Sequence, residues 1–184
     1  MTMTDVMAED RRLEVLFSAE RISERLGSLA TEIAARKLEP LLVVAILKGS
    51  FVFAADLIRA LNRVGMQPEV DFITLSSYRK ARVSSGNVEI LRDVELDVGG
   101  RNVLLVDDVL DSGRTLAFAK DLMAARGAAS VSTCVLLSKS TRRAVQVAAD
   151  FSAFDCPAEF VVGYGMDAAH RFRELPFVAR LTES

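Results

Sequence analysis

The chain has 184 residues, 51% of them hydrophobic, so it can form one packed domain that buries about 70% of its unfolded surface. Its 23 basic and 25 acidic residues give a formal net charge of −2, which provides no electrostatic case for nucleic acid or a membrane surface as the main partner. The longest purely apolar run, residues 41–47, is too short to cross a bilayer, and the first residues lack the pattern of a secretory signal. Cys134 and Cys156 have no metal-ligand spacing, so we expect a cytoplasmic protein with reduced thiols.

Residues 1 to about 17 are mixed and include a loosely held terminus, and from there apolar residues in short runs or at helical spacing predict an alternation of strands and helices. The predicted elements are a helix capped by Ser18, a strand over 41–47, a helix over 51–64 ended by Gly65, strands over 70–75, 88–91 and 103–106, a helix over 116–126, and strands over 131–137, 151–154 and 160–162. This alternation predicts an α/β fold with a parallel-rich sheet covered on both faces, in a single domain over residues 1–184.

The stretch VLLVDDVLDSGRTL, residues 103–116, carries the densest chemistry. A buried strand is expected to end in an acid-rich turn with Asp107, Asp108 and Asp111, followed by a small-residue loop and a helix start. In open parallel sheets, ligands bind beyond the carboxyl ends of the strands, and a loop leading into a helix offers backbone N–H groups to a phosphate. The acids beside it would suit sugar hydroxyls or a divalent cation. The alternative from residues alone is a solvated turn with an ordinary helix cap.

This stretch resembles the phosphoribosyl pyrophosphate signature of the type I phosphoribosyltransferases, most closely that of the hypoxanthine-guanine enzymes. The resemblance spans roughly residues 41–175. It implies that family's central sheet flanked by helices, with a small hood formed by the terminal segments. It also implies that Asp107 and Asp108 hold the ribose hydroxyls and a magnesium ion, and that Asp111 is the general base. The 5-phosphate is expected on Ser112, Gly113, Arg114 and Thr115. Asp107 departs from the family, which usually has Glu there.

Two further places follow strand ends. LKGS, residues 47–50, is by itself a strand-to-helix turn with one lysine, which could simply be a surface residue. The resemblance makes it the pyrophosphate loop, with Lys48 and Gly49 as ligands and a cis peptide before Lys48. Lys139 follows the strand over 131–137 and could equally be a solvated lysine. In the resembling family, a lysine at this place donates to the 6-oxo group of the purine.

The segment EFVVGYGMD, residues 159–167, is similar to the family's purine-proximal stretch. By that similarity Phe160 stacks on the base and the backbone of Val161 contacts its edge. Met166 lines the opposite side, Asp167 helps to hold a second magnesium ion through water, and Arg173 approaches pyrophosphate. Ala158 and Ala168 depart from the family's usual Asp and aromatic residue. His170 is expected on the surface.

Residues 79–86 are basic and small, with few apolar anchors. They could form an ordinary exposed hairpin connection, or a lid over the site that begins at Ser77 and Tyr78. The resemblance as a whole implies an enzyme that transfers the 5-phosphoribosyl group from phosphoribosyl pyrophosphate to N9 of hypoxanthine, and also of guanine, with Mg²⁺ as cofactor. It also implies a homo-dimer or homo-tetramer. The alternatives are a nucleotide-binding regulator on the same fold, for which a basic face would be expected, and an enzyme used mainly for xanthine.

Overall fold

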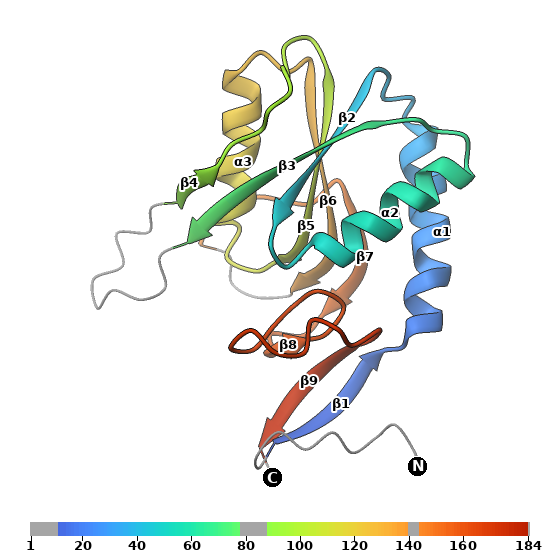
Figure 1. Cartoon of the computed structure of the whole chain (residues 1–184), viewed down its shortest axis with the longest axis vertical. Coiled ribbons are helices and arrows are strands. Elements are labelled where there is room, and N and C mark those ends of the chain that lie inside the picture. Colours follow the sequence, from blue (N-terminus) through green and yellow to red (C-terminus); the bar gives the residue numbers. More distant parts are fainter. Residues whose placement is uncertain (1–10, 78–87, 140–143, 184) are drawn as a thin grey trace.

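The computed structural model describes residues 11–77, 88–139 and 144–183 (Figure 1). In chain order the elements are β1 (Arg11–Phe17), α1 (Ala19–Ala35), β2 (Leu41–Leu47), α2 (Phe51–Arg63), β3 (Glu69–Ser77), β4 (Val88–Arg92), β5 (Asn102–Leu110), α3 (Arg114–Ala125), β6 (Ser130–Lys139), β7 (Phe151–Cys156), β8 (Val161–Val162) and β9 (Val178–Glu183). Tyr78 and the basic segment over 79–86, predicted as a possible lid, lie outside the described residues.

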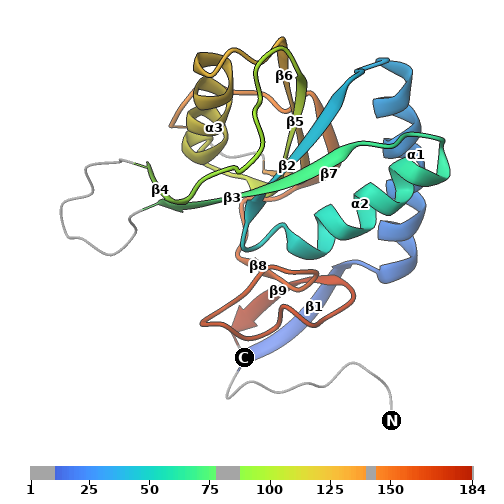
Figure 2. The ribbon, with the colours of Figure 1, turned by 45° about the horizontal axis from the view of Figure 1, so that its top comes forward.

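Six strands form the central sheet in the order β4-β3-β2-β5-β6-β7 across the described part of the chain. All neighbouring pairs are parallel except β3 with β4. Helices α1 and α2 cover one face of this sheet and α3 covers the other (Figures 1 and 2). The predicted parallel-rich sheet with both faces covered is therefore confirmed.

The local signals in the sequence account for most of these elements. Leu41–Leu47 is buried along nearly its whole length because both faces of β2 are covered. The side chain of Ser18 accepts a hydrogen bond from the N–H of Arg21 and caps α1, as predicted. After α2 and α3, Gly65 and Gly127 adopt positive φ, a conformation that glycine adopts without a steric penalty.

The two ends of the described chain build a second, three-stranded sheet in the order β1-β9-β8, which we call the hood. It lies beside the carboxyl ends of the central strands (Figures 1 and 2). The prediction of a hood from the terminal segments is thus confirmed, but no strand is predicted before Ser18, and Arg11–Phe17 form β1. That strand pairs with β9, which lies more than 160 residues away, so no local pattern reveals it.

Strand β5 is longer than predicted. The strand was expected to end at Val106, but it continues through both aspartates to Leu110. The reason is that β6 is equally extended and pairs with it as far as Leu110 and Ser138. The turn therefore begins at Asp111.

The chain runs outward from β2 to β3 on one side and then returns to place β5 on the other side of β2. Such a reversal opens a crevice at the carboxyl ends of the two central strands, and ligands bind there in open α/β sheets. The turns after β2 and β5 flank this crevice. Over the described ranges, no helix has the length and apolar character needed to cross a membrane.

Candidate active site

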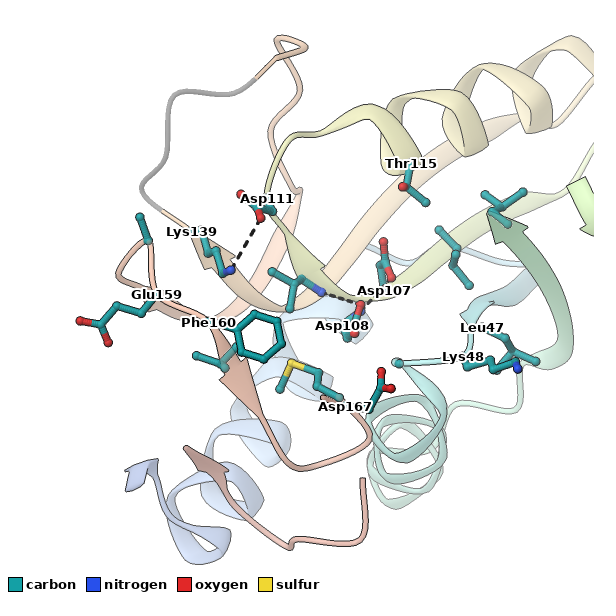
Figure 3. A pocket seen from close by; sticks show the side chains of 17 residues that line it. Leu47, Lys48, Asp107, Asp108, Asp111, Thr115, Lys139, Glu159, Phe160 and Asp167 are labelled. Carbon is teal, nitrogen blue, oxygen red and sulfur yellow. Dashed lines mark hydrogen bonds and ion pairs between the residues drawn. The ribbon is translucent and has the colours of Figure 1, made fainter. Parts of the chain in front are cut away.

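A pocket of about 440 Å³ opens between the carboxyl ends of the central strands and the hood (Figure 3). Most of the predicted site residues line it: Lys48, Gly49, Asp107, Asp108, Asp111, Thr115, Lys139, Phe160, Val161, Met166 and Asp167. Ser77, the last residue of β3, is not among the lining residues, but Leu75 of the same strand is. Segments separated by more than 100 residues thus meet at one site.

Asp107 and Asp108 lie on the last part of β5, so their side chains alternate between the two faces of the strand. The carboxylate of Asp107 accepts the N–H of Asp108, and that of Asp108 accepts the N–H of Val109. Asp107 is only 7% exposed. Its burial, and the neighbouring charge of Asp108, raise the pKa of Asp107 well above its ordinary value.

The turn from Asp111 to Gly113 leads directly into α3. Gly113 is the N-cap residue and has φ +81°, and it provides no side-chain cap. A Cβ atom on Gly113 would lie 2.6 Å from Cγ1 of Val147, so both the backbone conformation and the packing require glycine. The Ser112 carbonyl oxygen accepts the N–H groups of Ala144 and Val145, which brace the turn. Of the four residues predicted to bind the 5-phosphate, Thr115 lines the pocket (Figure 3), whereas Ser112, Gly113 and Arg114 precede it in the chain and are not part of the pocket lining.

The turn after β2 contains the cis peptide bond Leu47–Lys48 that the resemblance implied. Next to it, a Cβ atom on Gly49 would lie 1.9 Å from Oδ2 of Asp108. The backbone of this turn therefore touches the acid pair of β5. Gly165, which has φ +97°, lies on the other side of this turn. A Cβ atom on Gly165 would lie 2.4 Å from the carbonyl oxygen of Gly49.

On the opposite side of the pocket, Lys139 faces Asp111 across a gap between the ends of β6 and β5 (Figure 3). Lys139 Nζ lies 3.6 Å from Asp111 Oδ2, and the Lys139 side chain is 12% exposed against 39% for Asp111. Phe160 is 54% exposed and its ring projects into the pocket (Figure 3), which the buried side chain of Met166 also lines. The site thus has a charged edge and an aromatic surface close together.

Asp167 and Arg173 pair with each other. Arg173 Nη2 lies 2.8 Å from Asp167 Oδ1, and Arg173 Nη1 donates to the Gly165 carbonyl oxygen at 2.6 Å. Asp167 also accepts the N–H of His170, whose side chain is exposed as predicted. Asp167 therefore lines the pocket, whereas Arg173 contacts Asp167 and is not itself part of the pocket lining.

Two interactions near the site involve residues that sequence reasoning did not single out. The hydroxyl of Tyr164 donates to a carboxylate oxygen of Asp56 and so ties the purine-proximal segment to α2. Burial, and then that hydrogen bond, raise the pKa of Tyr164. Glu159 lines the pocket and pairs with Arg180 of β9. Tyr164 and Glu159 belong to the segment 159–167 identified from the sequence. Their partners, Asp56 and Arg180, belong to distant elements, so no local pattern in the sequence indicates these pairs.

Known proteins with similar sequences and structures point the same way. The chain matches the phosphoribosyl transferase domain over residues 14–169. It is 39% identical over 172 residues to hypoxanthine phosphoribosyltransferase from Escherichia coli, covering 92% of this chain and 95% of that protein. It is 42% identical over 170 residues to hypoxanthine-guanine phosphoribosyltransferase from Aquifex aeolicus, covering 91% and 94%.

Solved structures agree with this. A hypoxanthine-guanine phosphoribosyltransferase from Bacillus anthracis superposes with a TM-score of 0.82 at 39% identity, covering 94% of this chain and 99% of that one. A hypoxanthine phosphoribosyltransferase from Staphylococcus aureus gives a TM-score of 0.88 at 34% identity, covering 98% and 97%. With the acid pair, the cis-peptide turn and the lysine–aspartate edge gathered at one pocket, the chain belongs to the phosphoribosyltransferase family of enzymes.

Proposed function

We propose that the protein is a purine-salvage enzyme that transfers the 5-phosphoribosyl group from phosphoribosyl pyrophosphate to N9 of hypoxanthine and of guanine. The products are inosine or guanosine monophosphate and pyrophosphate. The similar enzymes from Escherichia coli and Aquifex aeolicus carry names for this activity, and the match extends over more than nine-tenths of the chain.

The observation that carries this proposal is the contact between Lys139 and Asp111 at 3.6 Å. In a 6-oxopurine, N7 and the 6-oxo group are neighbours on one edge of the ring. A protonated lysine offers only donors and a carboxylate only acceptors, so this pair can match an acceptor at the 6-oxo group and an N7 proton at once. Lys139 would donate to the oxygen, and Asp111 would take the N7 proton as general base. Phe160 would stack on the ring, with Met166 on its other side and the Val161 backbone at its edge.

The other half of the pocket suits the phosphoribosyl pyrophosphate. The start of α3, with Gly113 as its cap and Ser112, Arg114 and Thr115 around it, offers N–H groups and hydroxyls to the 5-phosphate. Lys48 and Gly49 would hold pyrophosphate, which Arg173 would also approach. Asp107 and Asp108 would hold the ribose hydroxyls.

We also propose Mg²⁺ as the cofactor, with one ion held by Asp107 and Asp108 and a second ion that Asp167 would help to hold through water. Carboxylate oxygens are the ligands this hard cation prefers, and a cation beside Asp107 would offset the burial that raises its pKa. Among the described residues no three acidic, histidine or cysteine side chains converge as a closed metal cage. Such an arrangement fits Mg²⁺, which commonly binds one or two carboxylates together with substrate phosphates and water. When bound, the ion neutralises and orients the leaving pyrophosphate.

The departure of pyrophosphate leaves a cationic sugar, and its charge development resembles that in glycoside cleavage. The acid pair of β5 lies beside the sugar in this arrangement and would stabilise that charge. Exclusion of water by the hood and by the stacked purine would protect the cation from hydrolysis.

The test is a steady-state assay with phosphoribosyl pyrophosphate, Mg²⁺ and each purine base in turn. We expect turnover of hypoxanthine and guanine, with pyrophosphate and the nucleoside monophosphate formed in equal amounts. Turnover of xanthine alone would favour the xanthine enzyme. Binding of nucleotides without any turnover would favour a regulator, although the charge balance of the chain gives that alternative little support.

We further propose a cytoplasmic location and a homo-dimer or homo-tetramer. Both cysteines are free and buried, as expected for a reducing compartment. Phe51 of α2 and Phe72 of β3 are each nearly half exposed, and large exposed aromatic side chains are typical of surfaces that associate. Light scattering after size-exclusion chromatography would test the association.

A further inference from the structure

The aromatic ring proposed to stack on the purine has little packing of its own. Phe160 is 54% exposed and precedes β8, a strand of only two residues at the edge of the hood. The position of this ring therefore depends on how its backbone is held. From Val161 onward the backbone pairs with β9, and at Phe160 itself one support is the N–H of Leu181, which donates to the carbonyl oxygen of Phe160 at 3.4 Å. This bond is long and supplies only part of the support.

The second support is an ion-pair cluster formed by Glu14, Glu159 and Arg180. Arg180 Nη1 donates to Glu159 Oε1 at 2.6 Å, and Nε and Nη2 donate to Glu14 Oε2 at 2.9 Å and 2.7 Å. Glu14 belongs to β1, Arg180 to β9, and Glu159 directly precedes Phe160. One guanidinium thus joins both terminal strands to the residue next to the stacking ring.

This cluster differs from an isolated surface ion pair, which commonly contributes little. The Arg180 side chain is 32% exposed, and its guanidinium lies between the carboxylates of Glu14 and Glu159, one from each side of β9. Hydrogen bonds to Glu14 and then Glu159 raise the pKa of Arg180, so the cation is permanent. Removal of the charge would leave mutual repulsion between the carboxylates. Glu159 is the member outside a regular strand, held by a turn in which its N–H donates to the Pro157 carbonyl oxygen, so the repulsion acts mainly on its position.

We infer that Arg180 is a positioning residue for the purine base: through Glu159 it fixes the backbone that presents Phe160 and Val161 to the pocket. This inference rests on the proposed function. It predicts a selective effect, because most of the residues proposed for phosphoribosyl pyrophosphate come from β5, α3 and the turn after β2, and Asp167 and Arg173 pair with each other rather than with the cluster.

The test is Arg180→Gln, which keeps a polar side chain and removes the charge. We expect the KM for hypoxanthine to rise about three- to fivefold, a range that corresponds to a partly buried ion pair. The KM for phosphoribosyl pyrophosphate should stay within about twofold. Arg12→Gln is the matched control, since Arg12 is an exposed arginine on the same ribbon of β1 and β9, and it should change neither constant.

Two more variants separate positioning from general loss of structure. Glu159→Gln should reproduce the rise in the KM for hypoxanthine, whereas Arg180→Lys should restore part of it because one ammonium can still pair with a carboxylate. If Arg180→Gln does not fold, the KM for hypoxanthine of Glu159→Gln tests the inference in its place. An unchanged KM for hypoxanthine, or an equal rise in both KM values, would overturn the inference.

Amide hydrogen exchange without ligand gives a readout that needs no activity. Residues 160–162 should exchange about three- to tenfold faster in Arg180→Gln than in the parent protein, while β5 is unchanged. Equal exchange at residues 160–162 would count against the inference. Failure of the parent protein to turn over any purine would instead reject the proposed function, so the two failures are distinguishable.

Discussion

Lys139 and Asp111 satisfy each other in the absence of substrate, although they are proposed to serve different atoms of the purine. Their 3.6 Å contact joins the ends of two neighbouring parallel strands. A ligand that enters between them must offer Lys139 a replacement partner, because its side chain is only 12% exposed and a buried charged group left unpaired costs roughly 1–3 kcal/mol. Discrimination among bases can therefore arise at Lys139.

Substitution of Asp111 by Asn tests the general base. Asn keeps the size of the side chain but cannot accept the N7 proton, so the chemical step should slow by about 10²–10⁴-fold. Single-turnover rates should be measured, because product release limits many enzymes at steady state. The KM for phosphoribosyl pyrophosphate should change little. An unchanged single-turnover rate at saturating substrates would rule out the general-base role.

Substitution of Lys139 by Ala tests base choice. Adenine carries an amino group where hypoxanthine has its 6-oxo group, so it would set a donor against the Lys139 ammonium. Sites built to hydrogen-bond their substrate can reject such mismatches by about 10⁴-fold. We expect adenine to be a very poor substrate of the parent enzyme. Lys139→Ala should lower kcat/KM for hypoxanthine and so reduce the ratio of kcat/KM between hypoxanthine and adenine. Lys120→Ala on α3 is the control. Adenine within tenfold of hypoxanthine in the parent enzyme would refute this assignment.

At the scale of elements, the turn after β2 is fixed by contacts from two directions. Gly49 abuts the carboxylate of Asp108, and its carbonyl oxygen abuts Gly165 of the segment over 159–167. A side chain on Gly165 would overlap with the backbone of Gly49, which side-chain flexibility cannot absorb. A side chain on Gly49 would overlap with the Asp108 carboxylate, which also accepts the N–H of Val109 and can move only by disturbing that hydrogen bond.

Gly49→Ala tests this contact. The added methyl group would lie 1.9 Å from Asp108 Oδ2, so the loop or the carboxylate must shift. We expect the KM for phosphoribosyl pyrophosphate to rise by about tenfold or more, equivalent to about 1.4 kcal/mol. Gly27→Ala in α1 is the matched control, because its methyl group would meet nothing within 4 Å. That control should leave activity intact and stabilise the protein by about 1 kcal/mol. An unchanged KM in Gly49→Ala would show that the loop tolerates the overlap.

The elements that could be predicted from the sequence are those that depend on interactions between residues close together in the chain. The buried run Leu41–Leu47 and the cap at Ser18 depend on neighbouring residues, and both were predicted at their observed places. The extension of β5 to Leu110 depends on a long partner in β6, so Asp107 and Asp108 were wrongly placed in a turn, whereas Asp111 lies in the turn as predicted. Strand β1 depends on β9 at the other end of the chain and was missed.

The same rule applies to the site. Residues in continuous motifs, such as Asp107 and Asp111, could be singled out because spacing and resemblance both mark them. Tyr164 with Asp56, and Glu159 with Arg180, are pairs formed only by tertiary structure. The spacing of residues in the sequence does not predict such pairs, because the two partners belong to different elements.

At the scale of the whole molecule, the hood and the α1/α2 face of the central sheet share one hydrophobic core. That core contains Phe17 and Val178 of the hood together with buried residues of α1, α2 and β2. Phe17 stacks on Phe154 of β7 with ring centroids 4.3 Å apart, and the guanidinium of Arg21 lies over both rings. We therefore propose that the hood and the central sheet form a single domain over residues 1–184 and unfold together.

Phe17→Ala tests that proposal, because Phe17 is 7% exposed and belongs to the hood but packs against the sheet. Loss of a buried phenylalanine costs roughly 3–5 kcal/mol, and in a single domain that cost lowers the stability of every element. The chain has no tryptophan, so unfolding is best followed by far-UV circular dichroism and by amide exchange in β5 and β9. All three should give the same reduced free energy of unfolding. Val15→Ala, an exposed position on the same strand, should change it by less than about 0.5 kcal/mol. Exchange that accelerates in β9 while β5 keeps its full protection would show that the hood unfolds separately, and the single-domain assignment would then be wrong.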